Sequence, residues 1–302
     1  MKYAEHIADL VGNTPLVRLN AVTRGVTKAT VLAKVEYLNP GGSVKDRIAR
    51  RMVEDAEASG ALQPGGTIVE PTSGNTGVGL ALIAQRKGYS CIFVCPDKVS
   101  EDKQNVLRAY GADVVVCPTA VPPDHPDSYY SVSNRLVTEI EGAWKPDQYS
   151  NPNGPASHYE TTGPEIWRET QGAVTHFVSS MGTTGTIMGT GRYLKEQNPQ
   201  IQIVGVQPSD GAQIPGIRKW PREYVPSICD FDKIDRIMEV TQQDAEDMAR
   251  RMAREEGIFA GISSGGALAA ALQLSSEVEN AVIVSIVCDR GDRYLSTGVF
   301  PA

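Results

Sequence analysis

The sequence lacks any apolar run near the roughly 18–20 residues that a membrane-spanning helix needs. Its first residues, Met1–His6, include an acid and no apolar segment, so no signal peptide is predicted. Internal repeats and low-complexity tails are missing as well. The 302 residues are 41% hydrophobic and 22% charged, which is ordinary for one or two globular domains. We therefore expect a cytoplasmic protein with no membrane partner.

Blocks of basic residues are also missing. The chain has 29 Lys and Arg against 36 Asp and Glu, and its formal net charge is −7. An acidic chain of this kind is a poor candidate for binding nucleic acid or an anionic membrane, because both attract clustered positive charge. A small anionic ligand stays possible, since a few local loops can hold one.

Cysteine and histidine are scarce and scattered. The five cysteines (Cys91, Cys95, Cys117, Cys229 and Cys288) are odd in number and lie mostly in apolar surroundings. They are therefore predicted to be reduced thiols in strands, without a disulfide framework. None of the four histidines has ligand spacing to another histidine or to a cysteine pair. We expect no bound metal.

Short β-branched runs alternate with helical patterns along the chain, and this alternation predicts an α/β fold with parallel sheets covered on both faces. The expected strands are 16–19, 31–35, 67–70, 91–95, 113–117, 176–178, 201–206 and 281–287. The expected helices are 43–59, 76–87, 101–110, 131–141, 186–197, 242–256 and 265–274. Ligands of such folds bind beyond the carboxyl ends of the strands, where strands turn into helices.

The first turn of interest is Asn39–Arg47, where Ser43 and Asp46 suggest a capping box with Lys45 in the first helical turn. A cation is disfavoured at a helix N-terminus unless it is paired, neutralised or used covalently. Lys45 is thus either a solvated lysine beside Asp46 or a reactive amine. Taken alone, the turn favours the solvated lysine.

Three further turns are rich in small polar residues: Glu70–Gly77, Ser179–Thr186 and Gly261–Gly266. Backbone N–H groups and hydroxyls gathered at a helix start suit a carboxylate or a phosphate. Each turn also has a plain interpretation as a capped strand–turn–helix connection. All four turns together match what an aldehyde cofactor with a phosphate needs, namely an amine, a phosphate cradle and a partner for a ring nitrogen. A sugar phosphate would need the cradle alone.

The turns Pro40–Arg47, Thr72–Gly77, Gly182–Thr186 and Gly261–Gly265 resemble the signature motifs of the pyridoxal-phosphate β-replacement family, in order and over essentially the whole chain. This family includes the cysteine synthases and the cystathionine β-synthases. Residues up to about Thr170 are most similar to the catalytic core of bacterial cystathionine β-synthases. From His176 onward the chain resembles the cysteine synthase B branch.

The resemblance implies the tryptophan-synthase-β-like fold (fold type II), with two three-layer α/β domains and the active site in the cleft between them. The implied N-terminal domain comprises residues 1–12 and 36–152, and the C-terminal domain comprises residues 13–35 and 153–302. The segment Gln148–Pro155 is expected to be the hinge. A homodimer is implied as well.

The resemblance also implies roles for single residues. Lys45 would bind the cofactor, pyridoxal 5′-phosphate, as an imine and would then take the α-proton of the substrate. Asn75 would contact the ring hydroxyl and Ser263 the ring nitrogen, with Ser264 the less certain of two serine positions. The implied phosphate ligands are Gly182, Thr183, Thr184, Gly185 and Thr186. The implied substrate ligands are Thr72, Ser73, Asn75, Thr76, Gln148 and, near the mouth of the site, Arg218. For Arg218 the alternative is a solvated basic pair with Lys219 on a loop.

The activity implied is β-replacement through an aminoacrylate, which forms L-cysteine from O-acetyl-L-serine (or an activated serine) and sulfide or thiosulfate. A serine beside the ring nitrogen leaves the ring largely neutral, which favours elimination over transamination. The alternatives are condensation of L-serine with L-homocysteine by a cystathionine β-synthase, and an inactive cofactor-binding module that binds a partner. The phosphate turn reads Gly-Thr-Thr-Gly-Thr, as in cysteine synthases. His158 is expected to be a hydrogen-bonded core or hinge histidine.

Overall fold

A computed structural model describes residues 1, 3–72, 74–122 and 124–300. The chain divides into two compact units, one made of Met1–Val11 with Asn39–Asn153 and one made of Gly12–Leu38 with Gly154–Ala302. We call them unit 1 and unit 2. These divisions lie one to three residues from the domain boundaries given above, and the assignment of functions to two domains stays a prediction.

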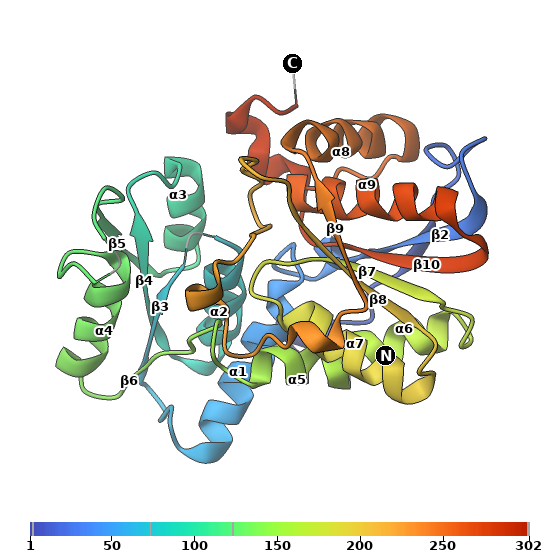
Figure 1. The fold of residues 1–302 in the computed structure, drawn as a ribbon. Coiled ribbons are helices and arrows are strands. Elements are labelled where there is room, and N and C mark those ends of the chain that lie inside the picture. Colours follow the sequence, from blue (N-terminus) through green and yellow to red (C-terminus); the bar gives the residue numbers. More distant parts are fainter. Residues whose placement is uncertain (2, 73, 123, 301–302) are drawn as a thin grey trace. The chain divides into compact units, whose positions relative to one another are not determined.

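Unit 1 is a parallel four-stranded sheet in the order β5-β4-β3-β6, with helices on both faces (Figure 1). A core of residues from α1, α2 and α3 packs on one face, and α4 packs on the other. Helices α1 and α2 each end at a glycine with positive φ, Gly60 and Gly88, which is a favoured way to stop a helix. Its elements are η1 (Ile7–Leu10), α1 (Lys45–Ser59), β3 (Thr67–Pro71), α2 (Asn75–Lys87), β4 (Ser90–Pro96), α3 (Glu101–Ala109), β5 (Asp113–Cys117), α4 (Tyr129–Glu139) and β6 (Ala143–Trp144).

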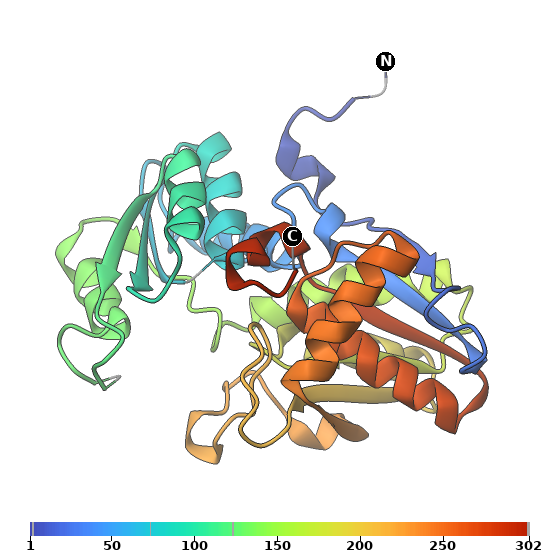
Figure 2. The same cartoon turned by 90° about the horizontal axis from the view of Figure 1, so that it is seen from above.

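Unit 2 is a six-stranded sheet in the order β1-β2-β10-β7-β8-β9. Figures 1 and 2 show α8 and α9 on one face of this sheet, with α6 and α7 on the other. Its strands are β1 (Leu16–Arg18), β2 (Lys28–Val35), β7 (His176–Ser180), β8 (Gln202–Pro208), β9 (Arg236–Val240) and β10 (Glu279–Val287). Its helices are η2 (Glu36–Leu38), α5 (Asn153–Glu160, which begins at the last residue of unit 1), α6 (Thr162–Glu169), α7 (Gly185–Gln197), η3 (Arg222–Tyr224), η4 (Phe231–Lys233), α8 (Gln242–Glu256), α9 (Ile262–Glu277) and η5 (Gly291–Thr297).

The α/β fold class predicted from the sequence is confirmed, although several elements differ from the prediction. Strand β1 runs antiparallel to β2, because a short loop joins them and a parallel pair would need a long crossover. Helices α5 and α6 were not predicted, since Gly154-Pro155 and Gly163-Pro164 read as loops. Proline is tolerated in the first turn of a helix, where its missing N–H has no partner in any case.

The edge strand β9 was missed as well. It has mostly exposed side chains and no continuous apolar run. Of the cysteines, Cys91, Cys95 and Cys117 lie in strands as expected, whereas Cys229 and Cys288 lie outside them. In the part of the chain that the structure describes, no helix is long and apolar enough to cross a membrane.

Candidate active site

Lys45 is the first residue of α1 and is partly buried. The helix N-cap is Val44, and the expected capping box is replaced by a different set of bonds. The Lys45 N–H donates to Ser43 Oγ (3.2 Å), and the Asp46 carboxylate accepts the N–H of Gly41. Asp46 thus stabilises the turn before the helix. This places the lysine at the positive end of the helix dipole, where an amine held covalently is better accommodated than a free ammonium.

The strand β3 leads into the turn that begins with Thr72 and into α2, whose first residue is Asn75. Helix α2 packs closely on α1, since a Cβ added at Gly79 would lie 3.1 Å from the Lys45 carbonyl oxygen. Thr72 and Thr76 are buried, and Asn75 is partly buried. The close approach of the two helices fixes the backbone of Lys45 relative to this turn. Ser73, which was also predicted to bind substrate, lies outside the described residues.

Gln148 lies in the segment between β6 and α5 and is buried. Its Oε1 accepts the hydroxyl proton of Thr76 at 2.7 Å, so two of the predicted substrate ligands touch although 72 residues separate them. Glu70 holds the same segment through the N–H groups of Asp147 and Gln148. Burial raises the pKa of Glu70 to about 7, against the lowering effect of these two hydrogen bonds and of Lys145.

In unit 2, β7 leads through Met181–Thr184 into α7, whose first two residues are Gly185 and Thr186. Thr184 is the N-cap of α7 and has a left-handed backbone (φ 71°), a rare conformation for threonine. Its Oγ1 is buried and bonds no nitrogen or oxygen atom among the described residues, and the Cys229 thiol is its one weak partner there. A buried hydroxyl beside the N–H groups of a helix start suits an anionic ligand, because the anion would satisfy both.

The glycines of this turn are needed for close backbone contacts. A Cβ at Gly182 would lie 2.7 Å from the Gly216 carbonyl oxygen, and one at Gly185 would lie 3.2 Å from the Gly154 carbonyl carbon. One turn further along α7, a Cβ at Gly189 would lie only 2.0 Å from the Pro155 carbonyl oxygen. The start of α5 therefore packs directly against the start of α7.

Ser263 is the second residue of α9 and is buried, and its carbonyl oxygen accepts the hydroxyl of Ser180 at 2.7 Å. The next serine has a structural contact, because Ser264 Oγ accepts the N–H of Cys288. Ser263 also lies against Gly216, where an added Cβ would be 3.1 Å from the Ser263 Cβ. Of the two serines, Ser263 is thus the better candidate for a ligand contact.

Arg218 is exposed and stacks over the ring of Trp220 at 5.5 Å. Its backbone N–H donates to Met181, and the Trp220 indole N–H donates to the Gly182 carbonyl, so the segment is tied to the phosphate turn. The neighbouring Lys219 is paired with Asp210 (2.6 Å) and Glu239.

Two contacts near these residues were not anticipated from the sequence. His158 is buried in α5 and bonds the hydroxyls of Thr162 and Thr186, so it touches a predicted phosphate ligand. The role of Glu70 was also missed. The motif Glu70–Gly77 includes this carboxylate, but only the fold brings it to Gln148. Within the described ranges, no group of His, Cys, Asp and Glu side chains is arranged to hold a metal ion.

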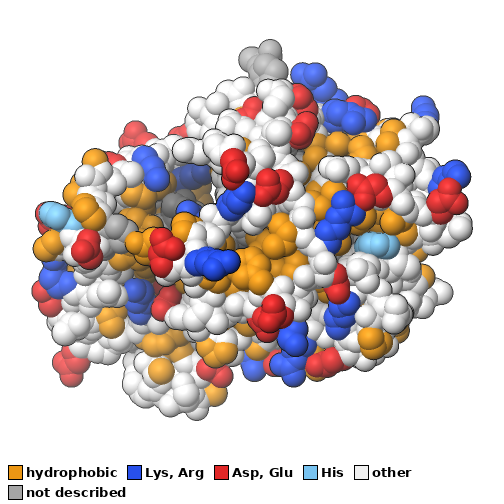
Figure 3. All heavy atoms as spheres, viewed as in Figure 1, with side chains coloured by type: hydrophobic (Ala, Val, Ile, Leu, Met, Phe, Trp, Pro, Cys, Tyr) orange, Lys and Arg blue, Asp and Glu red, His pale blue; other side chains and the backbone are white. Residues whose placement is uncertain are grey.

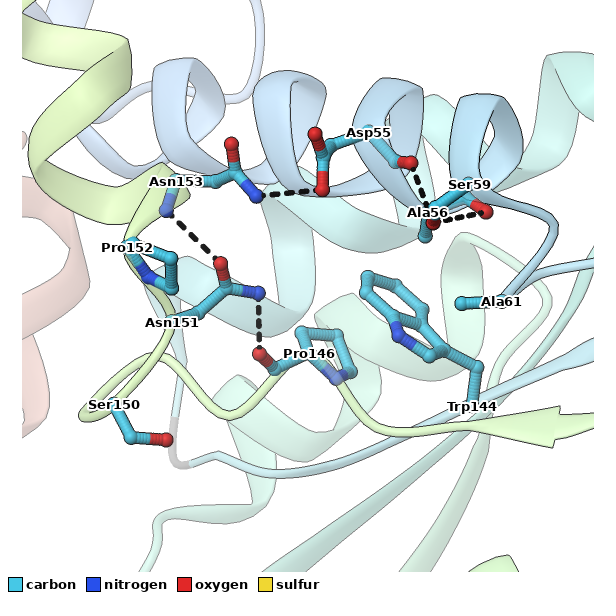
Figure 4. Close-up of a pocket in the computed structure, with 10 residues that line it drawn as sticks. All are labelled: Asp55, Ala56, Ser59, Ala61, Trp144, Pro146, Ser150, Asn151, Pro152 and Asn153. Carbon is cyan, nitrogen blue, oxygen red and sulfur yellow. Dashed lines mark hydrogen bonds between the residues drawn. The ribbon is translucent and has the colours of Figure 1, made fainter.

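A cavity of about 340 Å³ lies in unit 1, but it is not formed by the predicted ligands. Figure 4 shows Trp144 facing the C-terminal part of α1, with Asn151 and Asn153 on the opposite side. Neither Lys45 nor Gln148 lines it. It lies beside the segment that bears Gln148, outside the candidate catalytic groups.

Taken unit by unit, the residues fit the aldehyde, the phosphate and the ring of pyridoxal phosphate. Lys45 supplies an amine, the start of α7 supplies N–H groups and the buried Thr184 hydroxyl, and Ser263 supplies a second hydroxyl.

Comparisons with known proteins agree with this fit. The sequence model of a family described as "Pyridoxal-phosphate dependent enzyme" matches residues 7–289. Cysteine synthase B of Pseudomonas aeruginosa is 53% identical, with 97% of each chain covered. Cystathionine beta-synthase of Apis mellifera is 40% identical over 98% of this chain and 61% of its own length. The crystal structure of a cysteine synthase from Entamoeba histolytica superposes with a TM-score of 0.92 at 33% identity, covering 100% of this chain and 92% of the other. By sequence and by fold, the chain belongs to the pyridoxal-phosphate dependent enzymes.

Proposed function

We propose that the enzyme forms L-cysteine by β-replacement, from O-acetyl-L-serine or another activated serine and from sulfide or thiosulfate. One observation carries the proposal: proteins named cysteine synthase B match this chain over 97% of its length and over 95–97% of their own. A lysine at the start of α1 and the Gly-Thr-Thr-Gly-Thr turn are consistent with it. The expected cytoplasmic location and homodimer are part of this proposal.

Each predicted residue receives a role in the proposal. Lys45 holds the cofactor through its aldehyde and later accepts the proton of the substrate α-carbon. Asn75 and Ser263 bind the cofactor ring, and residues 182–186 bind its phosphate. When bound, the cofactor withdraws electrons from the α-carbon and so weakens its C–H bond. Ser263 offers a hydroxyl without negative charge, which leaves the ring nitrogen without a counter-ion.

The substrate carboxylate is assigned to the turn after β3 and to Gln148. Thr76 has a single hydroxyl hydrogen, and it is given to Gln148 Oε1. Thr76 therefore orients Gln148, and it has only its backbone N–H to offer the carboxylate. The Gln148 Nε2 group is left as a donor. Ser73 stays a predicted ligand, and so does Arg218 for an anionic sulfur donor.

The rival is the cystathionine β-synthase reaction, and a spectrum with two substrates separates the two. The purified protein is expected to show visible cofactor absorption. We expect O-acetyl-L-serine to convert this band to that of the β-elimination product, and L-serine to do so at least tenfold less efficiently. Ready conversion by L-serine, followed by product formation with L-homocysteine, would favour the rival. Absence of any cofactor band would overturn the role of Lys45 in either reaction.

Replacement of Lys45 tests the catalytic assignment directly. Lys45→Ala removes the proposed proton acceptor, so kcat is expected to fall by about 10³-fold, within the usual range for general acid–base groups. The circular dichroism spectrum should not change. Lys87→Ala is the control, because Lys87 is a partly exposed lysine whose one ion pair among the described residues is with Glu57. Turnover by Lys45→Ala within tenfold of the parent would refute the assignment.

A further inference from the structure

Glu70 is a buried carboxylate that bonds two consecutive backbone N–H groups. It lies near the end of β3, pairs with Phe93 of β4, and has no exposed surface. Its Oε2 accepts the N–H of Asp147 at 3.0 Å, and its Oε1 accepts the N–H of Gln148 at 3.2 Å. Each carboxylate oxygen thus fixes one peptide of the segment between β6 and α5.

The segment held in this way is in an unfavourable backbone conformation. Asp147 has φ 51°, which is left-handed and uncommon for a residue with a side chain. Its carbonyl accepts the N–H groups of Ser150 and Asn151, which closes a tight turn. Such a conformation persists only where its surroundings hold it. The Glu70 carboxylate is one of the groups that hold it.

The connection from β3 to α2 contacts Gln148 at two points. Glu70 precedes the turn and fixes the Gln148 backbone, while Thr76 follows the turn and fixes the Gln148 side chain. Backbone and amide are therefore positioned by one element, β3–α2. We propose that Glu70 is a positioning residue for the amino-acid substrate: it holds Gln148 so that the Gln148 amide can bind the substrate carboxylate. This inference rests on the proposed function only for the role given to Gln148.

Protonation of Glu70 would disturb this arrangement. A protonated carboxyl has lost its negative charge and has a hydrogen on one oxygen, so that oxygen is a weaker acceptor for the backbone N–H that it faces. Burial raises the pKa of Glu70 to about 7, Lys145 lowers it and Asp147 raises it. These are the two charged side chains among the described residues that act on Glu70, and the facing residue on β4 is Phe93. Substrate binding is therefore expected to weaken as the pH falls below 7.

The test compares the parent enzyme with Glu70→Gln as holoenzymes between pH 6 and pH 8. In Glu70→Gln, the KM for O-acetyl-L-serine is expected to rise about tenfold or more at pH 8, as for the loss of one or two hydrogen bonds to a charged group, while kcat changes less than threefold. The parent KM should rise as the pH falls from 8 to 6, with an inflection near 7. That inflection should be missing in Glu70→Gln, whereas titrations of the substrates themselves affect both proteins equally.

A matched control is Glu36→Gln, because Glu36 is an equally buried carboxylate that accepts the Thr14 hydroxyl in unit 2. It should keep the parent KM within twofold and keep the inflection. A Glu70→Gln enzyme with an unchanged KM, or with the parent inflection, would overturn the proposal. If Glu70→Gln does not fold, the proposal is tested with Thr76→Val and with the pH dependence of the parent KM. Thr76→Val should raise the KM and keep the inflection near pH 7. A parent KM that is constant from pH 6 to pH 8 would contradict the proposal.

Failure of the proposed function is recognised separately. If the parent enzyme does not turn over O-acetyl-L-serine with either sulfur donor at pH 8, binding of L-serine is measured from the cofactor absorption instead. The dissociation constant of L-serine should then be higher for Glu70→Gln at pH 8, and it should show an inflection near pH 7 in the parent enzyme alone. Equal dissociation constants for the parent enzyme and Glu70→Gln would reject the role of Glu70 whatever the reaction.

Discussion

His158 connects two threonine hydroxyls within unit 2. Its Nδ1 lies 2.8 Å from Thr162 Oγ1, and its Nε2 lies 3.2 Å from Thr186 Oγ1. A hydroxyl has one hydrogen, so a Thr186 that donates to a phosphate must accept from Nε2–H. In the neutral ring Nδ1 is then the acceptor, and Thr162 donates to it. His158 therefore selects the direction in which the Thr186 hydroxyl points.

His158→Phe keeps an aromatic ring of similar size and removes both nitrogens. We expect the apoenzyme to bind pyridoxal phosphate about tenfold more weakly, because Thr186 loses the donor that orients it. Titration of the apoenzyme measures this affinity, and the ³¹P resonance of the bound phosphate should shift as well. Tyr159→Phe is the neighbouring control, since the Tyr159 hydroxyl bonds only the exposed Glu196 among the described residues. Equal affinities would remove His158 from the phosphate site.

Single residues show what the sequence can and cannot predict. The predicted roles of Lys45 and of residues 182–186 come from local motifs that resemble a family, and that of Gln148 is implied by the same resemblance. The contacts of Glu70 with Gln148 and of His158 with Thr186 join residues 78 and 28 positions apart. No local pattern marks such pairs, because a buried glutamate or histidine is defined by its neighbours in space.

At the scale of elements, strand β2 is joined to helix α6 by a buried ion-pair cluster. Lys34 in β2 has a completely buried side chain, and its Nζ lies 2.9 Å from Glu165 and 2.8 Å from Glu169. Glu165 also accepts the N–H of Asn13. The cluster therefore links the early segment Gly12–Leu38 to a helix formed much later in the chain.

Lys34→Met is expected to destabilise the protein by about 3–5 kcal/mol, because it leaves two carboxylates without their shared cation. Urea unfolding followed by circular dichroism measures the loss. Lys28→Met in the same strand is the matched control, since the Lys28–Glu279 pair is largely exposed and is expected to contribute less than about 1 kcal/mol. A similar loss in both variants would show that burial of the pair is not what matters.

At the scale of the whole molecule, the formal net charge is −7. Acidic and basic side chains are interspersed on the face drawn in Figure 3. The net charge of −7 corresponds to an isoelectric point near 5.2. Near that pH the molecules lose their mutual repulsion.

We expect a solubility minimum close to pH 5.2, with light scattering rising as the pH falls from 6.5 and declining again below about 4.5. Raising the net negative charge by succinylating lysines should move the minimum to lower pH. A flat scattering profile from pH 7 to pH 4.5 would contradict the expectation. Most of the pH 6–8 range used for the kinetic measurements on Glu70 lies above pH 6.5.

The fold class, both sheets and most of their strands follow from the alternation of short apolar runs with helical patterns. The sequence did not predict the elements that depend on contacts with other parts of the fold, namely β6, β9, α5 and α6. Strand β6 has two residues and exists through its pairing with β3. Strand β9 is an edge strand that pairs with β8 alone among the described strands.

The position of β2 in the sheet has a consequence for how the protein is made. Leu32 pairs with Val284, so β2 pairs with a strand that is synthesised about 250 residues after it. Until β10 is synthesised, the edge of β2 that pairs with it has no partner strand. All four strands of the unit 1 sheet have been synthesised by then. Non-local pairing of this kind is slow and exposes the nascent chain to aggregation. The sheet of unit 2 is thus expected to form only once β10 has been synthesised, long after all the strands of unit 1 are available.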